Sequence, residues 1–73
     1  MPNVKNNASS LETQAKLVEA AGKVFAERGL HAATLKEITD LAGANQASIN
    51  YHFRDKYELY GAVIRSAVRL TPL

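Results

Sequence analysis

The stretch that decides the fold runs from residue 34 to residue 56 and reads TLKEITDLAGANQASINYHFRDK. Its first residue, Thr34, and Glu37 have the spacing of a capping box, in which two side chains satisfy the free amides at the start of a helix. Gly43 separates two short helical patterns, and glycine adopts the positive φ of a sharp bend at little cost. This order of helix, glycine turn and helix predicts a helix-turn-helix.

The helix expected before the turn has one apolar and one charged side. The residues expected in the core are Leu35, Ile38, Leu41 and Ala42, while Lys36, Glu37 and Asp40 should face outward. Thr39 is a polar residue among the apolar ones. Its hydroxyl is expected either to bond back to a carbonyl of the same helix or to face the edge of a groove.

The helix expected after the turn, at about residues 46–53, has a much narrower apolar stripe. Asn45 is placed to cap it, and only Ile49 and Phe53, one turn apart, have the character of core anchors. The other positions are polar, aromatic or small. A short helix held in this way exposes most of its surface, which indicates that another molecule docks against it.

A longer helical pattern, at about residues 11–28, precedes this unit. Its apolar positions at helical spacing include Leu11, Ala15, Val18 and Phe25. Ser9 and Glu12 have capping-box spacing at its start, and Gly29 should end it as a left-handed cap. Ion pairs in the favourable order are expected on its outer face, at Glu12–Lys16 and Glu19–Lys23. Residues 1–8 are polar and are expected to form a flexible N-terminal arm.

Another helical pattern follows the helix-turn-helix and begins at Lys56. Asp55 and Glu58 supply a third capping box, and Pro72 is expected to end the helix. The apolar face of this helix is broad, and the residues without an evident partner in the chain are Ile64, Val68, Leu70 and Leu73. Together the patterns predict an all-α domain of four helices over residues 9–73.

Composition limits the classes of protein to which the chain can belong. With 73 residues and no cysteine, one small domain without disulfides or thiolate metal sites is expected. The net charge of +2 is too small to indicate a nucleic-acid partner by itself, although the excess of basic residues lies in residues 46–73. No apolar run approaches the roughly 20 residues that cross a bilayer, and no secretion signal is evident. A cytoplasmic protein without a membrane segment is therefore expected.

Neither an enzyme site nor a cofactor site is expected. Ser48 and His52 share one helical row, but no carboxylate is placed at a sensible position to orient the imidazole. His52 as a lone histidine is not expected to bind a metal ion. The sequence also has no glycine-rich loop of the kind that cradles phosphates.

Three pieces of the chain have a spacing that is highly specific in combination. They read AAGKVFAERG at residues 20–29, TLKEIT at residues 34–39 and LAGANQASINYHFRDKYELYGAV at residues 41–63. Together they resemble the DNA-binding domain of the tetracycline-repressor (TetR) family of bacterial regulators, and the resemblance extends over residues 14–67. It implies a homeodomain-like bundle of four helices that contains the helix-turn-helix.

The resemblance also implies a function, which is sequence-specific binding of double-stranded DNA. The chain would be the reading head of a bacterial transcription regulator, more often a repressor, with the second helix of the motif in the major groove. Members of the family join such a head to a larger helical domain that binds an effector and forms a homodimer on a palindromic operator. That second domain is expected to lie outside these 73 residues.

The residues that open the recognition helix are expected to meet the base edges. Gln46 can bond N6 and N7 of adenine, Ala47 can touch a thymine methyl group, and Ser48 can bond several base edges or a phosphate. The ordinary alternative for Gln46 is a solvated helix residue. Asn50 is also expected at the DNA, although it is shorter than the tyrosine that is usual there in the family. Other departures from the family pattern are Ala44 for valine and Thr39 for alanine.

Further residues are expected to contact phosphates. Tyr51 and His52 would do so through the ring hydroxyl and the imidazole, with burial in the core as the alternative for Tyr51. Lys56 and the first amides of the last helix form an expected anion site, because a helix N-terminus presents free N–H groups. Thr34 and Lys36 lie at the N-terminus of the helix before the turn, where the same argument predicts a phosphate contact. The alternative for Thr34 is that it only caps this helix.

A second function from another class stays open at this point. The chain could be a helical module for protein interaction or self-association that acts through the apolar face of the last helix. This alternative rests on Ile64 and Val68, which have few partners in so small a domain.

Overall fold

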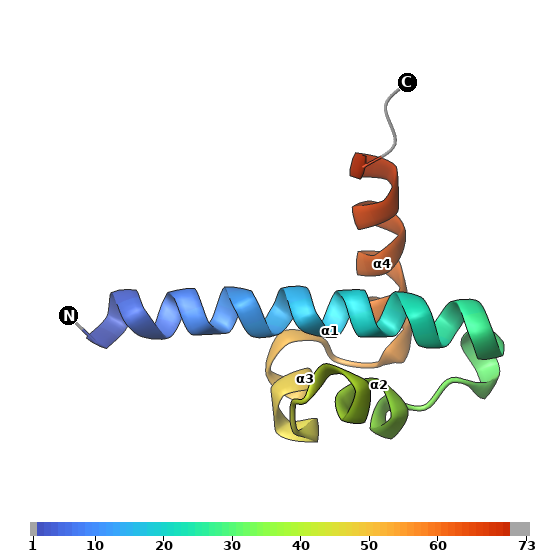
Figure 1. Cartoon of the computed structure of the whole chain (residues 1–73), viewed down its shortest axis with the longest axis horizontal. Helices are drawn as coiled ribbons and strands as arrows, with labels where there is room; N and C mark the ends of the chain where they lie inside the picture. The colour runs from blue at the N-terminus through green and yellow to red at the C-terminus, as the bar shows by residue number, and fades with distance from the viewer. Residues whose placement is uncertain (1, 71–73) are drawn as a thin grey trace.

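The chain folds into four helices around one small core. The computed structural model describes the backbone of residues 2–70 and the side chains of residues 10–68. The helices are α1 (Pro2–Ala32), α2 (Leu35–Ala42), α3 (Gln46–His52) and α4 (Lys56–Leu70) (Figure 1). The predicted all-α fold of four helices is confirmed, and α2 and α3 form the helix-turn-helix.

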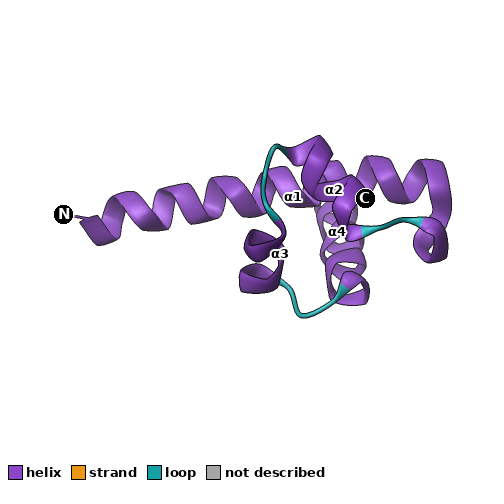
Figure 2. Cartoon of the chain, turned by 90° about the horizontal axis from the view of Figure 1, so that it is seen from below, coloured by secondary structure: helices purple, strands orange, loops and turns teal. Residues whose placement is uncertain are grey.

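α1 is the long element against which the other three helices pack. α2 and α3 lie on one side of it, below α1 in Figure 1, whereas most of α4 extends from the other side. The view from below in Figure 2 shows α3 beside the middle part of α1. The helix-turn-helix is thus carried on a different side of α1 from the C-terminal part of α4.

The core lies where the four helices meet. Its fully or almost fully buried residues are Leu17, Ala20, Ala21, Val24, Phe25, Ala33, Ile38, Ile49, Phe53 and Leu59. The ring of Phe25 meets that of Tyr60 edge to face, with 5.2 Å between the centroids, a favourable geometry for two aromatic rings. Leu11 belongs to the apolar stripe predicted for this helix but lies outside the core, because 67% of its surface is exposed. It lies on the part of α1 before the helix crossing, where it borders an open hollow between α1 and α4.

The start of α1 differs from the prediction. The helix begins at Pro2 and not near Leu11, so the predicted capping box of Ser9 and Glu12 does not mark a helix start. Proline is compatible with a first helical turn because it has no N–H to leave unpaired. The asparagines and serines that follow lower helix propensity only modestly. The flexibility of the predicted arm, residues 1–8, stays a prediction.

The helical conformation of α1 is interrupted at Gly29, the residue at which the sequence predicted the helix to end. Gly29 has φ 84° and ψ 161°, whereas a left-handed helical cap would have ψ near 47°. The expected left-handed cap is therefore wrong in conformation although right in position. The extended ψ allows one more helical turn, closed by a 3.0 Å bond from the Ala33 amide to the Gly29 carbonyl, before the chain enters α2.

The turn between α2 and α3 matches its prediction. Gly43 has φ 71° and ψ 31°, which is the left-handed conformation. The Oδ1 atom of Asn45 accepts a 3.0 Å bond from the Ser48 amide and caps α3 as expected. These two residues fix the direction in which α3 leaves α2.

Two further capping boxes were predicted, and one of them is altered. The Thr34 hydroxyl accepts from the Glu37 amide at 3.1 Å, and the Glu37 carboxylate accepts from the Thr34 amide at 3.1 Å. At the start of α4, Asp55 accepts from the Glu58 amide at 2.9 Å. The Glu58 carboxylate, however, accepts from the amide of Arg54 at 2.7 Å. In a standard capping box this carboxylate would accept from the amide of the capping residue, Asp55. Here it accepts from the residue before it.

The buried face of α2 is rotated relative to the prediction. Ile38 is fully buried as expected, but Leu41 is 54% exposed and Thr39 is buried. The Thr39 hydroxyl donates to the Lys36 carbonyl at 3.0 Å, which satisfies it inside the core. Of the two expectations for Thr39, the bond back to a carbonyl is confirmed.

α4 ends at Leu70, next to the predicted stop at Thr71 and Pro72. Those two residues, Leu73, and the side chain of Leu70 lie outside the described part of the chain. Across residues 2–70, no helix combines the length and apolar content that a membrane crossing requires.

Candidate nucleic-acid interface

α3 exposes one face and buries another. Ile49 is fully buried and Phe53 is 5% exposed, so the two predicted anchors are confirmed. The residues of α3 on the exposed side are Gln46, Ala47, Asn50 and Tyr51, while Ser48 and His52 are half-buried. The helix is therefore fixed to the domain along one edge and presents the other to solvent.

The Ser48 hydroxyl takes part in the start of α3. It donates to the Asn45 Oδ1 atom at 3.3 Å, beside the bond that the Ser48 amide makes to the same atom. A hydroxyl has one proton and two lone pairs. With its proton directed to Asn45, Ser48 is left as an acceptor, which suits a base amino group better than a phosphate oxygen.

Tyr51 lies outside the core. Its surface is 79% exposed, so the alternative that it is buried is wrong. The Tyr51 ring packs edge to face against the ring of His52, with 5.0 Å between centroids. His52 in turn stacks at a tilt beside Phe53, 6.2 Å away. The aromatic sequence Tyr51-His52-Phe53 thus leads from the exposed end of α3 into the core.

The N-terminus of α2 carries the other predicted contacts. The Thr34 hydroxyl is engaged in its capping box, so capping, the alternative weighed for this residue, is its role in the fold. Lys36 has an 80% exposed side chain that pairs with Asp40 at 3.2 Å. Exposed pairs of this kind are weak, so the Lys36 ammonium is free to exchange Asp40 for a phosphate. Phosphate contacts at Thr34 and Lys36 stay predictions.

Lys56 has partners that the sequence did not indicate. Its ammonium donates to the backbone carbonyls of His31 and Ala33, at 3.0 Å each. An ammonium has three protons, so one is left for another acceptor. The predicted phosphate contact of Lys56 stays a prediction, but its side chain is already used to join α4 to the end of α1.

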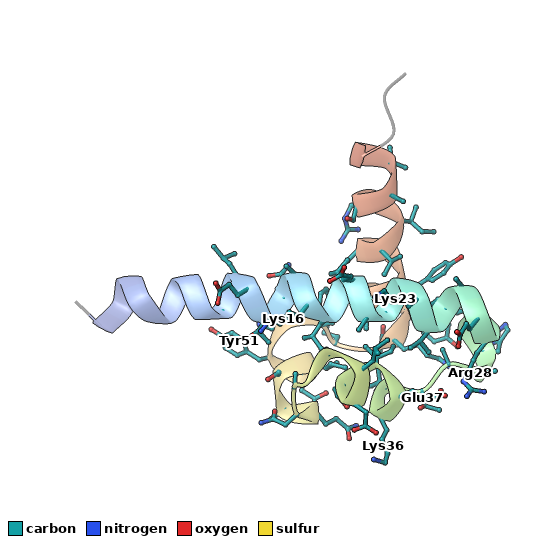
Figure 3. All side chains as sticks on the ribbon, in the orientation of Figure 1. Lys16, Lys23, Arg28, Lys36, Glu37 and Tyr51 are labelled. Atoms are coloured by element: carbon teal, nitrogen blue, oxygen red, sulfur yellow. The ribbon has the colours of Figure 1, made fainter. Side chains whose placement is uncertain are left out.

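Lys16 is a candidate that the sequence analysis missed. It was expected to pair with Glu12, and a second pair was expected at Glu19–Lys23. Neither pair is among the ion pairs within 4.0 Å of the described side chains. Lys16 instead lines a small hollow between α1 and the end of α2. In the view of Figure 3 the side chains of Lys16 and Tyr51 are both seen just below α1.

A sequence signal for Lys16 exists in hindsight. Lys16, Ala20 and Lys23 recur at intervals of four and three residues, so they share one face of α1. Ala20 on that face is buried. The two lysines therefore flank a position that packs toward the helix-turn-helix.

The described side chains offer no cluster of metal ligands. None of them form a group of three or more histidine, cysteine, aspartate or glutamate residues that could hold a metal ion. The larger hollow, about 700 Å³ between α1 and α4, is lined mostly by small and apolar residues, with Gln14, Glu19 and Ser66 as its polar members. It lies toward the C-terminal part of α4 and not beside α3.

Comparisons with known proteins agree on one family. Residues 17–63 match the family described as bacterial regulatory proteins, tetR family. The chain is 36% identical over 63 residues to the HTH-type transcriptional repressor BepR of Brucella suis biovar 1, covering 86% of this chain and 30% of that protein. No solved structure matches the chain.

Two other relatives are similar over a shorter segment. The HTH-type transcriptional regulator TtgR of Pseudomonas putida is 42% identical over 55 residues, which is 75% of this chain and 26% of that protein. The HTH-type transcriptional activator FasR of Mycolicibacterium smegmatis is 44% identical over 57 residues, which is 78% of this chain and 26% of that protein. The chain thus spans only about a quarter to a third of the length of these relatives.

The family match covers more than half of the chain and includes α2, the Gly43 turn, α3 and the start of α4. The same elements form the helix-turn-helix of the fold, and the relatives carry that motif in their names. The chain therefore belongs to the TetR family of DNA-binding bacterial transcription regulators.

Proposed function

We propose that this chain reads a specific duplex sequence by placing α3 in the major groove. The observation that carries the proposal is the division of α3 into a buried edge, with Ile49 and Phe53, and an exposed face. The major groove of B-DNA is wide enough to admit an α-helix, and the first residues of a recognition helix come nearest to the bases. The match to a family of regulators supports the same use of the helix.

The base contacts in this proposal come from the first turn of α3. Gln46 is exposed and offers an amide that bonds adenine at N6 and N7 together. Ala47 provides a methyl group for thymine, and Ser48 accepts a bond from a base amino group. Asn50, one turn after Gln46, extends the same exposed row.

The phosphate contacts surround these residues. We propose Tyr51 and His52 at the end of α3, Thr34 and Lys36 at the start of α2, and Lys56 at the start of α4. To these we add Lys16, an exposed cation on α1 next to the helix-turn-helix. Phosphate contacts fix the position of a protein on DNA without reading the sequence.

The experiment that tests sequence reading is selection of bound duplexes from a random pool. We expect one enriched half-site, and two copies of it in inverted order if the regulator acts as a dimer. Gln46→Ala should bind the selected duplex about 5- to 150-fold more weakly, because one bidentate base contact gives about 1–3 kcal/mol of discrimination. Its affinity for random duplexes should equal that of the parent. If Gln46→Ala and the parent select the same sequences with equal affinity, α3 does not read bases as proposed.

The salt dependence of binding tests the phosphate contacts. Only the lysines among them neutralise a phosphate, so Lys16, Lys36 and Lys56 together should make log K fall by roughly 2.7 for each log unit of salt. Lys16→Met should make this slope shallower by about 0.9 and weaken selected and random duplexes equally. Lys23→Met is the matched control, because Lys23 lines the same hollow from the same face of α1 but lies about two helical turns further along the helix. An unchanged slope for Lys16→Met would remove Lys16 from the interface.

We further propose that the chain works as part of a repressor that forms a homodimer on a palindromic operator in the cytoplasm. The relatives are three to four times longer than their matched segments, which leaves room for an effector-binding and dimerising domain. One relative is named a repressor and another an activator. A promoter carrying the selected site should be transcribed less in the presence of the complete regulator, and increased transcription would make it an activator. Selection of a single half-site by the complete regulator would contradict the palindrome.

The comparisons do not favour the alternative of an interaction module that acts through α4. Ile64 and Val68 are 46% and 66% exposed, and this apolar surface is compatible with packing against a further domain of the same regulator. DNA reading accounts for the exposed face of α3 as well, which an α4 interaction module does not explain.

A further inference from the structure

Both hydrogen-bond donors of Thr34, its backbone amide and its hydroxyl, are bonded to one oxygen atom of Glu37. The Glu37 Oε1 atom accepts from the Thr34 amide at 3.1 Å and from the Thr34 hydroxyl at 3.2 Å. The hydroxyl oxygen in turn accepts from the Glu37 amide at 3.1 Å. An amide N–H and a hydroxyl each have a single proton to donate, so both donors of Thr34 are in use in this conformation.

This arrangement bears on the phosphate contact proposed for Thr34. The residue is exposed and lies at the N-terminus of α2, where a phosphate can reach it. A phosphate oxygen of the DNA backbone accepts hydrogen bonds, so a contact with the hydroxyl requires its proton. The Glu37 carboxylate and a phosphate are both anions, and the positive end of the helix dipole attracts both. They cannot hold the hydroxyl proton of Thr34 at the same time.

Arg28, near the end of α1, holds the other oxygen of the same carboxylate. Its Nε atom forms an ion pair with Oε2 of Glu37. The side chain of Arg28 is 55% exposed and that of Glu37 is 32% exposed, and ion pairs at the surface have little stability. A guanidinium has five N–H donors and can bind both oxygens of a carboxylate. Arg28 can therefore also bind Oε1 when that oxygen leaves Thr34.

We infer that Glu37 holds, in the free protein, the donors of Thr34 that a DNA phosphate takes in the complex. Arg28 is then a positioning residue, which binds the carboxylate when the phosphate displaces it. Since every duplex has phosphates, Glu37 lowers the affinity for selected and random sequences alike. The inference rests on the proposed function, because it takes a phosphate contact of Thr34 as its starting point.

The alternative is that Arg28 and Glu37 only fasten the end of α1 to the start of α2. Removal of either charge would then weaken DNA binding, because the helix-turn-helix would lose a support. Competition predicts opposite signs for the two changes. Binding should become tighter without the Glu37 carboxylate and weaker without the Arg28 guanidinium.

The affinity of the 73-residue chain for selected and random duplexes measures the competition. We expect Glu37→Gln to bind both about three- to tenfold more tightly, because a neutral acceptor holds the Thr34 donors less strongly than a carboxylate. Glutamine is also found at this position of capping boxes, so α2 should keep its start. Glu27→Gln is the matched control, because it removes one negative charge from an exposed residue outside the capping box. It should change the affinity less than about twofold.

Arg28→Met tests the role of the guanidinium. In the parent it should weaken binding to both kinds of duplex about two- to fivefold, because the Glu37 carboxylate loses its cationic partner. In the Glu37→Gln variant the same change should weaken binding no more than Lys23→Met, which removes another exposed cation of α1. An equal loss with and without the Glu37 carboxylate would mean that Arg28 contacts the phosphate itself, and would overturn its role as a positioning residue.

Circular dichroism gives the folded fraction of each variant, so that affinities are compared per folded molecule. Equal or weaker binding of Glu37→Gln relative to the parent would overturn the inference and leave the proposed function in place. An equal gain in Glu27→Gln would also overturn it, because the gain would then come from net charge alone. If the parent binds no duplex at all, the proposed function fails, and this inference fails with it.

Discussion

Replacing Ile49 with alanine will lower the free energy of unfolding by about 2–5 kcal/mol, the usual range for a large aliphatic residue truncated in a core. Ile49 is fully buried and is one of only two anchors of α3, which has 7 residues. A helix this short has almost no stability of its own. Since small domains have marginal stability, the loss should unfold a large fraction of the molecules and abolish DNA binding.

A denaturant titration followed by circular dichroism measures this change. Leu41→Ala is the matched control, because it removes a side chain of similar size from α2 at a position that is 54% exposed. We expect Leu41→Ala to cost less than about 1.5 kcal/mol, since roughly half of its apolar surface already meets water. Equal costs for the two variants would contradict the assignment of Ile49 as the anchor of α3.

Leu41 also shows what the sequence could not predict about the fold. The order of helices and most of their ends follow from local chemistry, such as the Thr34–Glu37 capping box and the left-handed Gly43. The buried face of α2 does not, because a helix of 8 residues offers few turns from which to locate an apolar stripe. Thr39 is buried there because its hydroxyl finds the Lys36 carbonyl, and this depends on packing against α1.

Some features of the candidate interface likewise follow from the local sequence, whereas others depend on contacts between distant residues. The exposure of Gln46 and Tyr51 follows from the helical period, once Ile49 and Phe53 are taken as anchors. The carbonyl partners of Lys56 could not be predicted, because they lie more than 20 residues away in the sequence. The spacing of Lys16, Ala20 and Lys23 defines a shared face of α1, but the element against which that face packs depends on the tertiary fold.

Replacing Gly29 with alanine will destabilise the domain by about 1–3 kcal/mol, although no atom stands in the way of the new methyl group. A Cβ atom at Gly29 would have no non-neighbouring heavy atom within 4 Å, so the cost is that of the backbone conformation. With φ 84° and ψ 161°, the residue occupies a region that side chains other than hydrogen almost never adopt. Thermal and denaturant unfolding would report the loss.

Gly43 supplies a control that isolates this cause, because a Cβ atom there also meets nothing within 4 Å. Its φ of 71° and ψ of 31° are left-handed helical, a conformation that asparagine tolerates. Gly43→Asn should therefore cost less than about 1 kcal/mol, whereas Gly29→Asn should cost as much as Gly29→Ala. If asparagine is equally well tolerated at both glycines, the extended ψ at Gly29 is not what makes glycine necessary there. If it is tolerated only at Gly43, the break near the end of α1 depends on glycine, and so does the path of the chain from Gly29 to α2, to which Lys56 and Glu37 donate or accept hydrogen bonds.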